Sequence, residues 1–254
     1  MNNPEHEAGQ VTLEPATHLA RAAAKLSHRE RLRFDKALEI LGGGGGAVAL
    51  ARAGMVVRGP GLFEALLARC WAVRCSNSEE LFKLAKSAVE VAARLHPRYG
   101  ARVVADLQAR AWGELANAYR IADRNRDAEH AFGKAFTFFC QGSGDRLLKA
   151  WLLDLQATLF GCSHEHVLAF GMLVTVRALY EELGEIHLAG RALLSQAVFA
   201  YVGGEAGKAL RLSQEGMARL DRRREPDLLA LAAHNHSIFE RALRKAGRPS
   251  GDES

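Results

Sequence analysis

The sequence predicts an all-α protein whose helices pack as antiparallel pairs into an α-solenoid. Three observations favour this fold class. Apolar residues recur at helical spacing almost throughout residues 62–247, and no segment shows the sustained alternation typical of a strand. Alanine and leucine dominate, whereas aromatic residues make up 7% of the chain, which favours helix over sheet. The breaks between helical segments are short, so successive helices are expected to lie antiparallel.

The N-terminal part of the chain predicts short helices beside a flexible joint. Ser27-x-x-Glu30 matches a capping box, in which the Ser oxygen accepts a backbone N–H bond and the Glu side chain reaches back. Five consecutive glycines, Gly42–Gly46, predict a hinge because glycine loses the most backbone freedom on folding. The helices expected in this part are 16–26, 28–41 and 47–53.

The rest of the chain predicts a regular series of helices. Glycine, proline and Ser-Asn signals bound each segment, and Ser76-x-x-Glu79 is a second capping box. The expected helices are 62–74, 79–95, 99–121, 126–139, 146–161, 165–183, 187–202, 206–220 and 226–246. The predicted organisation is a helical and flexible N-terminal segment over 1–58 with a Gly hinge at 42–46, an α-solenoid over 62–247 and a disordered tail over 248–254.

One segment, 112–135, carries a spacing motif across two predicted helices. It contains Trp112-x2-Leu115-x3-Tyr119 and then Ala128-x3-Phe132-x2-Ala135. Large side chains on the first helix are expected to fill the space beside small alanines on the second. The residues predicted to pack together are Trp112, Leu115, Tyr119, Ala128, Phe132 and Ala135.

This motif resembles the tetratricopeptide repeat, W-x2-L-G-x2-Y…A-x3-F…P, with Ala116 in place of the glycine and the late proline missing. Weaker copies put equivalent alanines at Ala128, Ala169 and Ala209, in steps of 41 and 40 residues. A standard repeat spans about 34 residues, so the chain resembles a long-helix variant of the family. The resemblance implies a non-catalytic superhelix whose concave face binds a peptide or a partner domain. The last expected helix, 226–246, has no partner after it and resembles a solenoid cap.

The resemblance also implies which side chains line the concave groove. In this family the first helix of each pair lines it, through residues one step away from the packed stripe. Several arginines and an asparagine on one concavity suit an acidic peptide or a terminal carboxylate, and the alternative is that these residues form a solvated helix face. The partner-binding residues predicted in this way are Arg110, Asn117, Arg120, Arg191, Tyr201, His234 and Arg241.

Composition and charge limit the kinds of partner and the cellular location that we expect for this chain. The 254 residues include 34 Lys and Arg against 29 Asp and Glu, and this mild excess does not require a nucleic-acid partner. The four cysteines show no C-x2-C spacing, so we expect reduced thiols packed against helices. The start lacks a signal-peptide pattern, and no apolar run reaches the roughly 18 to 20 residues of a membrane span. We therefore expect a cytoplasmic protein without a membrane partner, and the Ala, Arg and Gly bias suggests a bacterial one.

Three other classes of site have weaker sequence support. Cys162-x-His164-x-His166 lacks the spacing of a zinc site, and no metal or cofactor is predicted; turn histidines and a buried thiol are expected instead. His234-Asn235-His236 is interpreted in the same way. Leu26–Arg31 resembles the opening of the helix-turn-helix domain of quorum-sensing-type regulators, but glycines follow where a recognition helix belongs. No G-x-S-x-G, phosphate-loop or H-E-x-x-H motif points to an enzyme.

The predicted function is therefore a non-catalytic scaffold that binds a peptide or partner protein in a concave groove. The alternative is a sensory or regulatory subunit of a bacterial transcription or signalling system, in which the N-terminal segment contacts DNA or a partner.

Overall fold

The computed structural model describes residues 24–45 and 59–246, and the elements in these ranges are helical. The expected helices at 16–26 and 47–53, and the expected tail at 248–254, lie wholly or mostly outside the described residues. Every expected helix from residue 62 onward is present, with each end within two residues of its prediction. The elements are α2 (His28–Ile40), the π-helical turn η1 (Leu41–Gly45), α4 (Pro60–Val73), α5 (Ser78–Ala93), the 3-10 turn η2 (Pro97–Tyr99), α6 (Ala101–Ile121), α7 (Asn125–Gln141), α8 (Arg146–Cys162), α9 (His166–Glu182), α10 (Ile186–Val202), α11 (Ala206–Arg219) and α12 (Pro226–Ala246).

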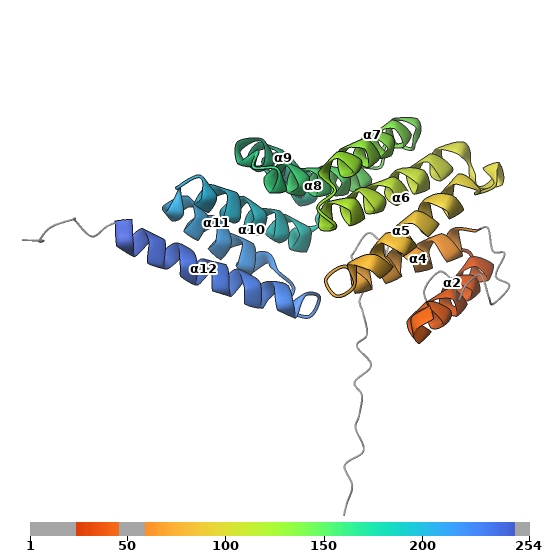
Figure 1. The fold of residues 1–254 in the computed structure, drawn as a ribbon, viewed down its shortest axis with the longest axis horizontal. Coiled ribbons are helices and arrows are strands. Elements are labelled where there is room, and N and C mark those ends of the chain that lie inside the picture. The colour runs from red at the N-terminus through yellow and green to blue at the C-terminus, as the bar shows by residue number, and fades with distance from the viewer. Residues whose placement is uncertain (1–23, 46–58, 247–254) are drawn as a thin grey trace, which may run out of the picture.

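The fold is an α-solenoid, as predicted. Each helix packs mainly against its neighbours in the chain, and the contacts within α6–α7 and α10–α11 are the most extensive. The pairs follow one another along an arch, which brings the turn between α4 and α5 near the turn before α12 (Figure 1). None of the helices in the described part of the chain combines the length and the hydropathy that a membrane crossing needs.

Small residues allow close approach between paired helices. A Cβ built on Gly190 of α10 would lie 2.9 Å from the carbonyl oxygen of Gly216 on α11, and the reverse contact is also 2.9 Å. Real side chains do not fit at that distance, so both glycines are needed where these two backbones cross. Ala128 and Ala135 of α7 are fully buried and serve the same purpose against α6.

The motif residues lie in the core but do not form one cluster. Trp112 packs against three separate clusters and joins them. One of these clusters contains Tyr119, Ala128 and Phe132 together with Leu159 of α8. Leu115 lies in a second cluster, with residues of α4 and α5. Ala135 lies in the third, with Leu148, Trp151 and Leu152 of α8. The reason is that α6 contacts α5, α7 and α8 on different sides, so its large side chains divide among three neighbours.

The capping predictions are partly right. Ser27 caps α2 by accepting a bond from the Glu30 N–H at 3.4 Å, but the Glu30 carboxylate does not return to Ser27. It instead accepts from the N–H of Gly61 at 2.9 Å and thereby supplies a cap for α4. The second predicted box is shifted by one residue, because Asn77 rather than Ser76 caps α5 by accepting from the Glu80 N–H at 3.0 Å.

Helix α2 belongs to the same core as the first helix pair. Ala37 and Leu41 are fully buried and pack in the cluster that also holds Phe63 and Leu66 of α4. A weakly coupled segment over 1–58 was expected, but the part of it that the structure describes is packed on α4. The boundary between an N-terminal segment and the solenoid, with a hinge at 42–46, remains a prediction.

Candidate functional site

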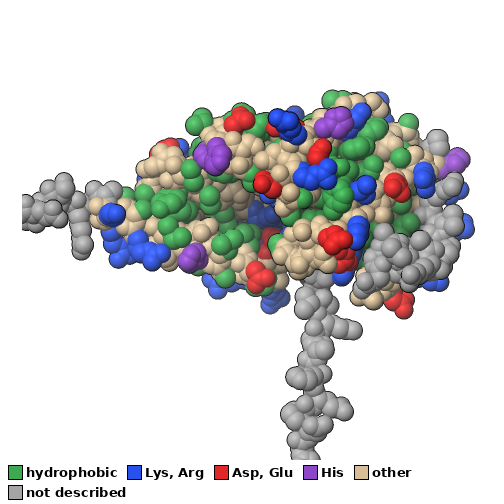
Figure 2. Space-filling view, in the orientation of Figure 1, with side chains coloured by type: hydrophobic (Ala, Val, Ile, Leu, Met, Phe, Trp, Pro, Cys, Tyr) green, Lys and Arg blue, Asp and Glu red, His purple; other side chains and the backbone are tan. Residues whose placement is uncertain are grey.

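The candidate site is the inner face of the arch, between the ends of α4 and α12. Figure 2 shows the molecule hollowed there, with basic and acidic side chains gathered inside the hollow. Arg74 at the end of α4 bonds through Nη2 to the Glu225 carboxylate, 151 residues away, at 2.9 Å. Five inner-face residues carry the charge of this region and are called the inner ring: Arg74, Glu114, Asp154, Arg191 and Glu225.

Glu225 contacts three side chains of its surroundings. It accepts from Arg74 and from His187 Nε2 at 3.1 Å, and Arg191 Nε lies 3.6 Å away. His187 Nδ1 accepts the Asp221 N–H at 3.0 Å, so in the neutral ring the proton is on Nε2 and points to Glu225. Burial opposes the ionisation of Glu225, but the His187 bond and the two guanidinium charges outweigh it and hold its pKa below the ordinary value.

An aromatic ring completes this contact between the ends of the arch. The Arg74 guanidinium lies over the Trp71 ring at 3.4 Å from its centroid, and the Arg191 guanidinium lies at 5.5 Å. Arg74 Nη1 also donates to the Trp71 carbonyl at 2.6 Å. We call the group of Trp71, Arg74, His187, Arg191 and Glu225 the clasp, because it joins α4 to α10 and to the start of α12.

The other two ring carboxyls differ from Glu225 in having no close cation. Within 4.0 Å of Glu114 and of Asp154 there is no basic side chain from the described residues. Burial raises the pKa of Glu114 to about 7, and the charge of Arg74 and a bond with Asn117 oppose this only in part. Burial also raises the pKa of Asp154, which accepts from the Tyr180 hydroxyl at 3.4 Å.

Two of the predicted groove residues are not exposed. Arg110 keeps 9% of its surface exposed and forms a two-pronged pair with Glu64 of α4, with N···O distances of 2.5 and 2.8 Å. Asn117 keeps 8% and accepts from Arg120 at 2.9 Å. The expectation of exposure was wrong for both, because Glu64 of α4 reaches Arg110, and Asn117 is bonded to Glu114 and Arg120 of its own helix.

Arg120 and Arg191 are half-exposed, and each has a different kind of partner. Arg191 is drawn towards Glu225 and Trp71 in the clasp. Arg120 bonds to the neutral Asn117 side chain and lies 3.9 Å from Cys162 Sγ, with no carboxylate within 4.0 Å among residues 24–45 and 59–246. Of the two predicted groove arginines on α6, Arg110 is paired with a carboxylate, whereas Arg120 is hydrogen-bonded to neutral groups.

The remaining predicted groove residues lie elsewhere on the solenoid. The Tyr201 ring is half-buried and packs on Phe239 of α12, with centroids 4.9 Å apart. His234 and Arg241 are exposed on α12. Arg241 follows Glu225 by 16 residues, which places it roughly 24 Å further along the helix axis. These residues therefore do not join the inner ring.

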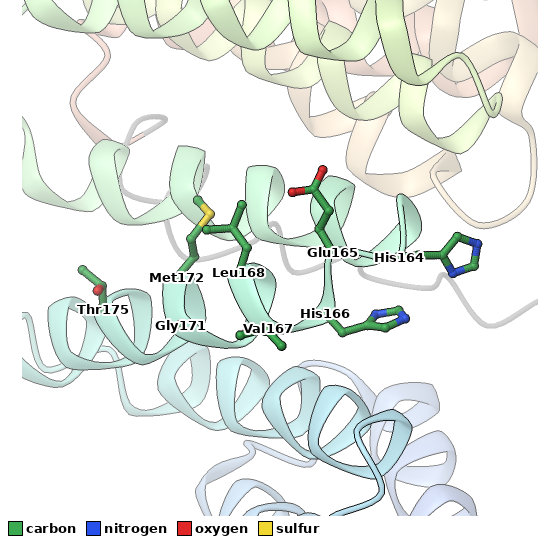
Figure 3. A pocket seen from close by; sticks show the side chains of 8 residues that line it. All are labelled: His164, Glu165, His166, Val167, Leu168, Gly171, Met172 and Thr175. Carbon is green, nitrogen blue, oxygen red and sulfur yellow. The ribbon is translucent and has the colours of Figure 1, made fainter.

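The histidines around the start of α9 do not form a metal-like cluster. His164 and His166 have ring centroids 5.8 Å apart, and Figure 3 shows Glu165 pointing away from both rings. His166 stacks on Phe199, which matches the expected turn histidine. In the part of the chain that the structure describes, no three His, Cys, Asp or Glu side chains come together as metal ligands do.

The cysteines and the N-terminal motif also differ from expectation. The thiol predicted to be buried, Cys162, is exposed, as are Cys75 and Cys140, whereas Cys70 is buried. In the Leu26–Arg31 motif, Glu30 is buried against α4, so part of the helix-turn-helix-like segment serves the core.

Comparisons with known proteins support the fold. No family model matches the chain, and no curated protein matches it. Among solved structures, the crystal structure of BtubC (BKLC) from P. vanneervenii is similar, with a TM-score of 0.50 and 15% sequence identity. The alignment covers 94% of this chain and 97% of that one. At this identity the likeness concerns the shared fold alone.

Proposed function

We propose that this protein is a non-catalytic scaffold of the tetratricopeptide type, which binds a peptide or partner protein on its inner face. The observation that carries the proposal is the inner ring, because helices from both ends of the arch bring charged side chains to one hollow. A structural core alone does not need these charges, since each costs desolvation energy on burial. A partner segment that contacts this inner face gives them a role.

Arg120 is the proposed anchor for an acidic segment. Arg110 and Arg191 already have carboxylate partners within the chain, so they contribute less to a new ion pair. Among the described residues, Arg120 has Asn117 and Cys162 as hydrogen-bond partners and no carboxylate within 4.0 Å, so its guanidinium can pair with a partner carboxylate. We therefore still propose an acidic partner, as the sequence predicted, but with Arg120 rather than several arginines as its main contact.

The test is a selection of peptides from a random displayed library on the wild-type chain. We expect enrichment in Asp and Glu and loss of the selected peptides, by tenfold or more, on the Arg120→Glu variant. Lys134→Glu on the outer side of α7 is the matched control, because Lys134 is exposed and carries the same charge. Equal recovery by both variants, or selected peptides without acidic residues, would rule out the proposed anchor.

A further inference from the structure

A cavity of about 640 Å³ lies where the start of α2 meets the first turns of α6 and α8. This volume is within the range of small-molecule sites, roughly 300 to 1,000 Å³. None of the five inner-ring residues lines the cavity, so it is separate from the proposed groove. We call it the α2–α6–α8 pocket.

The walls of the pocket are largely apolar. They include aliphatic side chains of α6 and α8, Leu26 just before α2, and the Trp151 ring of α8. Val103 keeps 48% of its surface exposed although it lies in the well-packed α6. The apolar groups used in the argument are Leu26, Val103, Leu107, Leu148, Trp151 and Leu183. Such a lining favours a ligand with an apolar body.

The charged groups of the pocket are mainly acidic. Four carboxylates line it against two basic side chains, Lys25 and Arg110. Glu64 is neutralised by its two bonds to Arg110. Glu30 accepts from Arg33 at 2.6 Å and from the Gly61 N–H. Both of these acids are thus satisfied within the chain.

Asp106 and Asp145 are the two carboxylates that can still accept hydrogen bonds from a ligand. Asp106 Oδ1 accepts the Ser143 N–H at 3.0 Å, and Asp145 Oδ1 accepts the N–H groups of Leu147 and Leu148 at 2.8 and 3.3 Å. The second oxygen of each has no hydrogen-bond partner, and no Lys or Arg lies within 4.0 Å, among the residues that the structure describes. Two half-satisfied acids therefore border an apolar cavity.

The turn that precedes Asp145 packs against Asp106 of α6. A Cβ on Gly142 would lie 2.0 Å from Asp106 Oδ1, so a glycine is required for the turn to approach Asp106. The next residue, Ser143, then bonds to Asp106, and Asp145 follows as the N-cap of α8. The arrangement is fixed before any ligand arrives, which favours binding.

We propose that the α2–α6–α8 pocket binds an organic cation whose protonated amine contacts Asp106 and Asp145 while its apolar body contacts the walls. Bonds between an ammonium group and carboxylate oxygens are charge-assisted and stronger than neutral ones. An anion of the same shape would face two unneutralised carboxylates and is expected to be excluded.

Tryptamine and indole-3-propionate test this proposal, because they share an indole body and differ in the charge of the side chain. Titration calorimetry and ligand-observed NMR on the full chain should show binding of tryptamine at least tenfold tighter than binding of the acid. The tryptamine affinity should also fall as salt is added, since the contact is ionic. Equal binding of the two probes, or binding of neither, would overturn the proposal.

The variant Asp106→Asn with Asp145→Asn separates the ligand contact from folding. Asparagine retains the oxygen that accepts the Ser143 N–H and is as good a helix N-cap as aspartate, so the fold should persist. Tryptamine binding should weaken tenfold or more in this variant and remain unchanged in Asp127→Asn, at the start of α7 outside the pocket. Unchanged binding in the double variant would show that these acids do not hold the amine.

Discussion

At the scale of single residues, Glu114 gives the stability of this protein a defined pH dependence. Its pKa is raised from 4.5 to about 7 in the folded state, chiefly by burial. The folded protein therefore keeps this proton at pH values where the unfolded chain has lost it, and the free energy of unfolding falls as pH rises between about 4.5 and 7. Glu114→Gln should remove this contribution, so that the variant gains about 1 to 3 kcal/mol over wild type between pH 5 and 8.

Denaturant unfolding at a series of pH values measures this difference directly. Glu129→Gln is the matched control, because Glu129 is exposed on α7 and its replacement should leave the pH profile as it is. Parallel profiles for wild type and Glu114→Gln would mean that the carboxyl is ionised in the folded state like an ordinary glutamate.

Residue-level sites were the least predictable part of the molecule. The spacing of Arg110, Asn117 and Arg120 predicts that they lie on one side of a helix, and all three belong to α6. It did not reveal that Glu64, 46 residues earlier, neutralises Arg110, or that Glu225 reaches Arg74 across 151 residues. Periodicity identifies a face of a helix, but the residues that cover that face depend on the path of the whole chain.

At the scale of the helices, the close packing of α6 against α8 requires a glycine at Gly113. A Cβ on this residue of α6 would lie 2.7 Å from both Leu152 Cδ2 and Trp151 Cζ3 of α8. Gly113→Ala should therefore destabilise the fold by about 1 to 2 kcal/mol, although alanine is the better helix former. Gly133→Ala in the exposed middle of α7, where nothing lies within 4 Å, should stabilise by about 0.5 to 1 kcal/mol.

Thermal and denaturant unfolding of the two variants compare the same substitution in two settings. Opposite signs are expected, because helix propensity favours alanine in both and only the α6–α8 contact opposes it. If both variants were equally stabilised, α6 and α8 would not be in the tight contact that the structure shows.

The helices themselves were predictable because their signals are local. Apolar residues at helical spacing, a capping side chain at α2, α5 and α8, and glycines or prolines near several ends are local signals, and α12 begins at Pro226 and ends at Ala246 as expected. Where two capping residues are adjacent, as in Ser76 and Asn77, local patterns did not decide between them. The family resemblance of the repeat stays a prediction, while the solenoid it implies is present.

At the scale of the whole molecule, the clasp determines how far the arch is closed. The helices α4 and α12 share no broad packing in the described ranges, so their ends are joined mainly through Arg74, Glu225 and Arg191. Both side chains of the Arg74–Glu225 pair are mostly buried, which makes this pair more consequential than a surface ion pair. Glu225→Arg would place three guanidinium groups at one point, and we expect the arch to open while the helices persist.

Pulsed electron resonance between two spin labels measures this opening. Cys75 and an Arg222→Cys replacement provide exposed labelling sites on the two sides of the clasp, once Cys140 and Cys162 are replaced by serine. The wild-type background should give one narrow distance distribution, and Glu225→Arg should give a longer and broader one with unchanged circular dichroism. Glu182→Arg, which breaks the exposed pair of Arg146 and Glu182, is the matched control and should leave the distribution as in wild type. A narrow distribution that survives Glu225→Arg would show that solenoid curvature, set by the stacked helix pairs, closes the arch without the clasp.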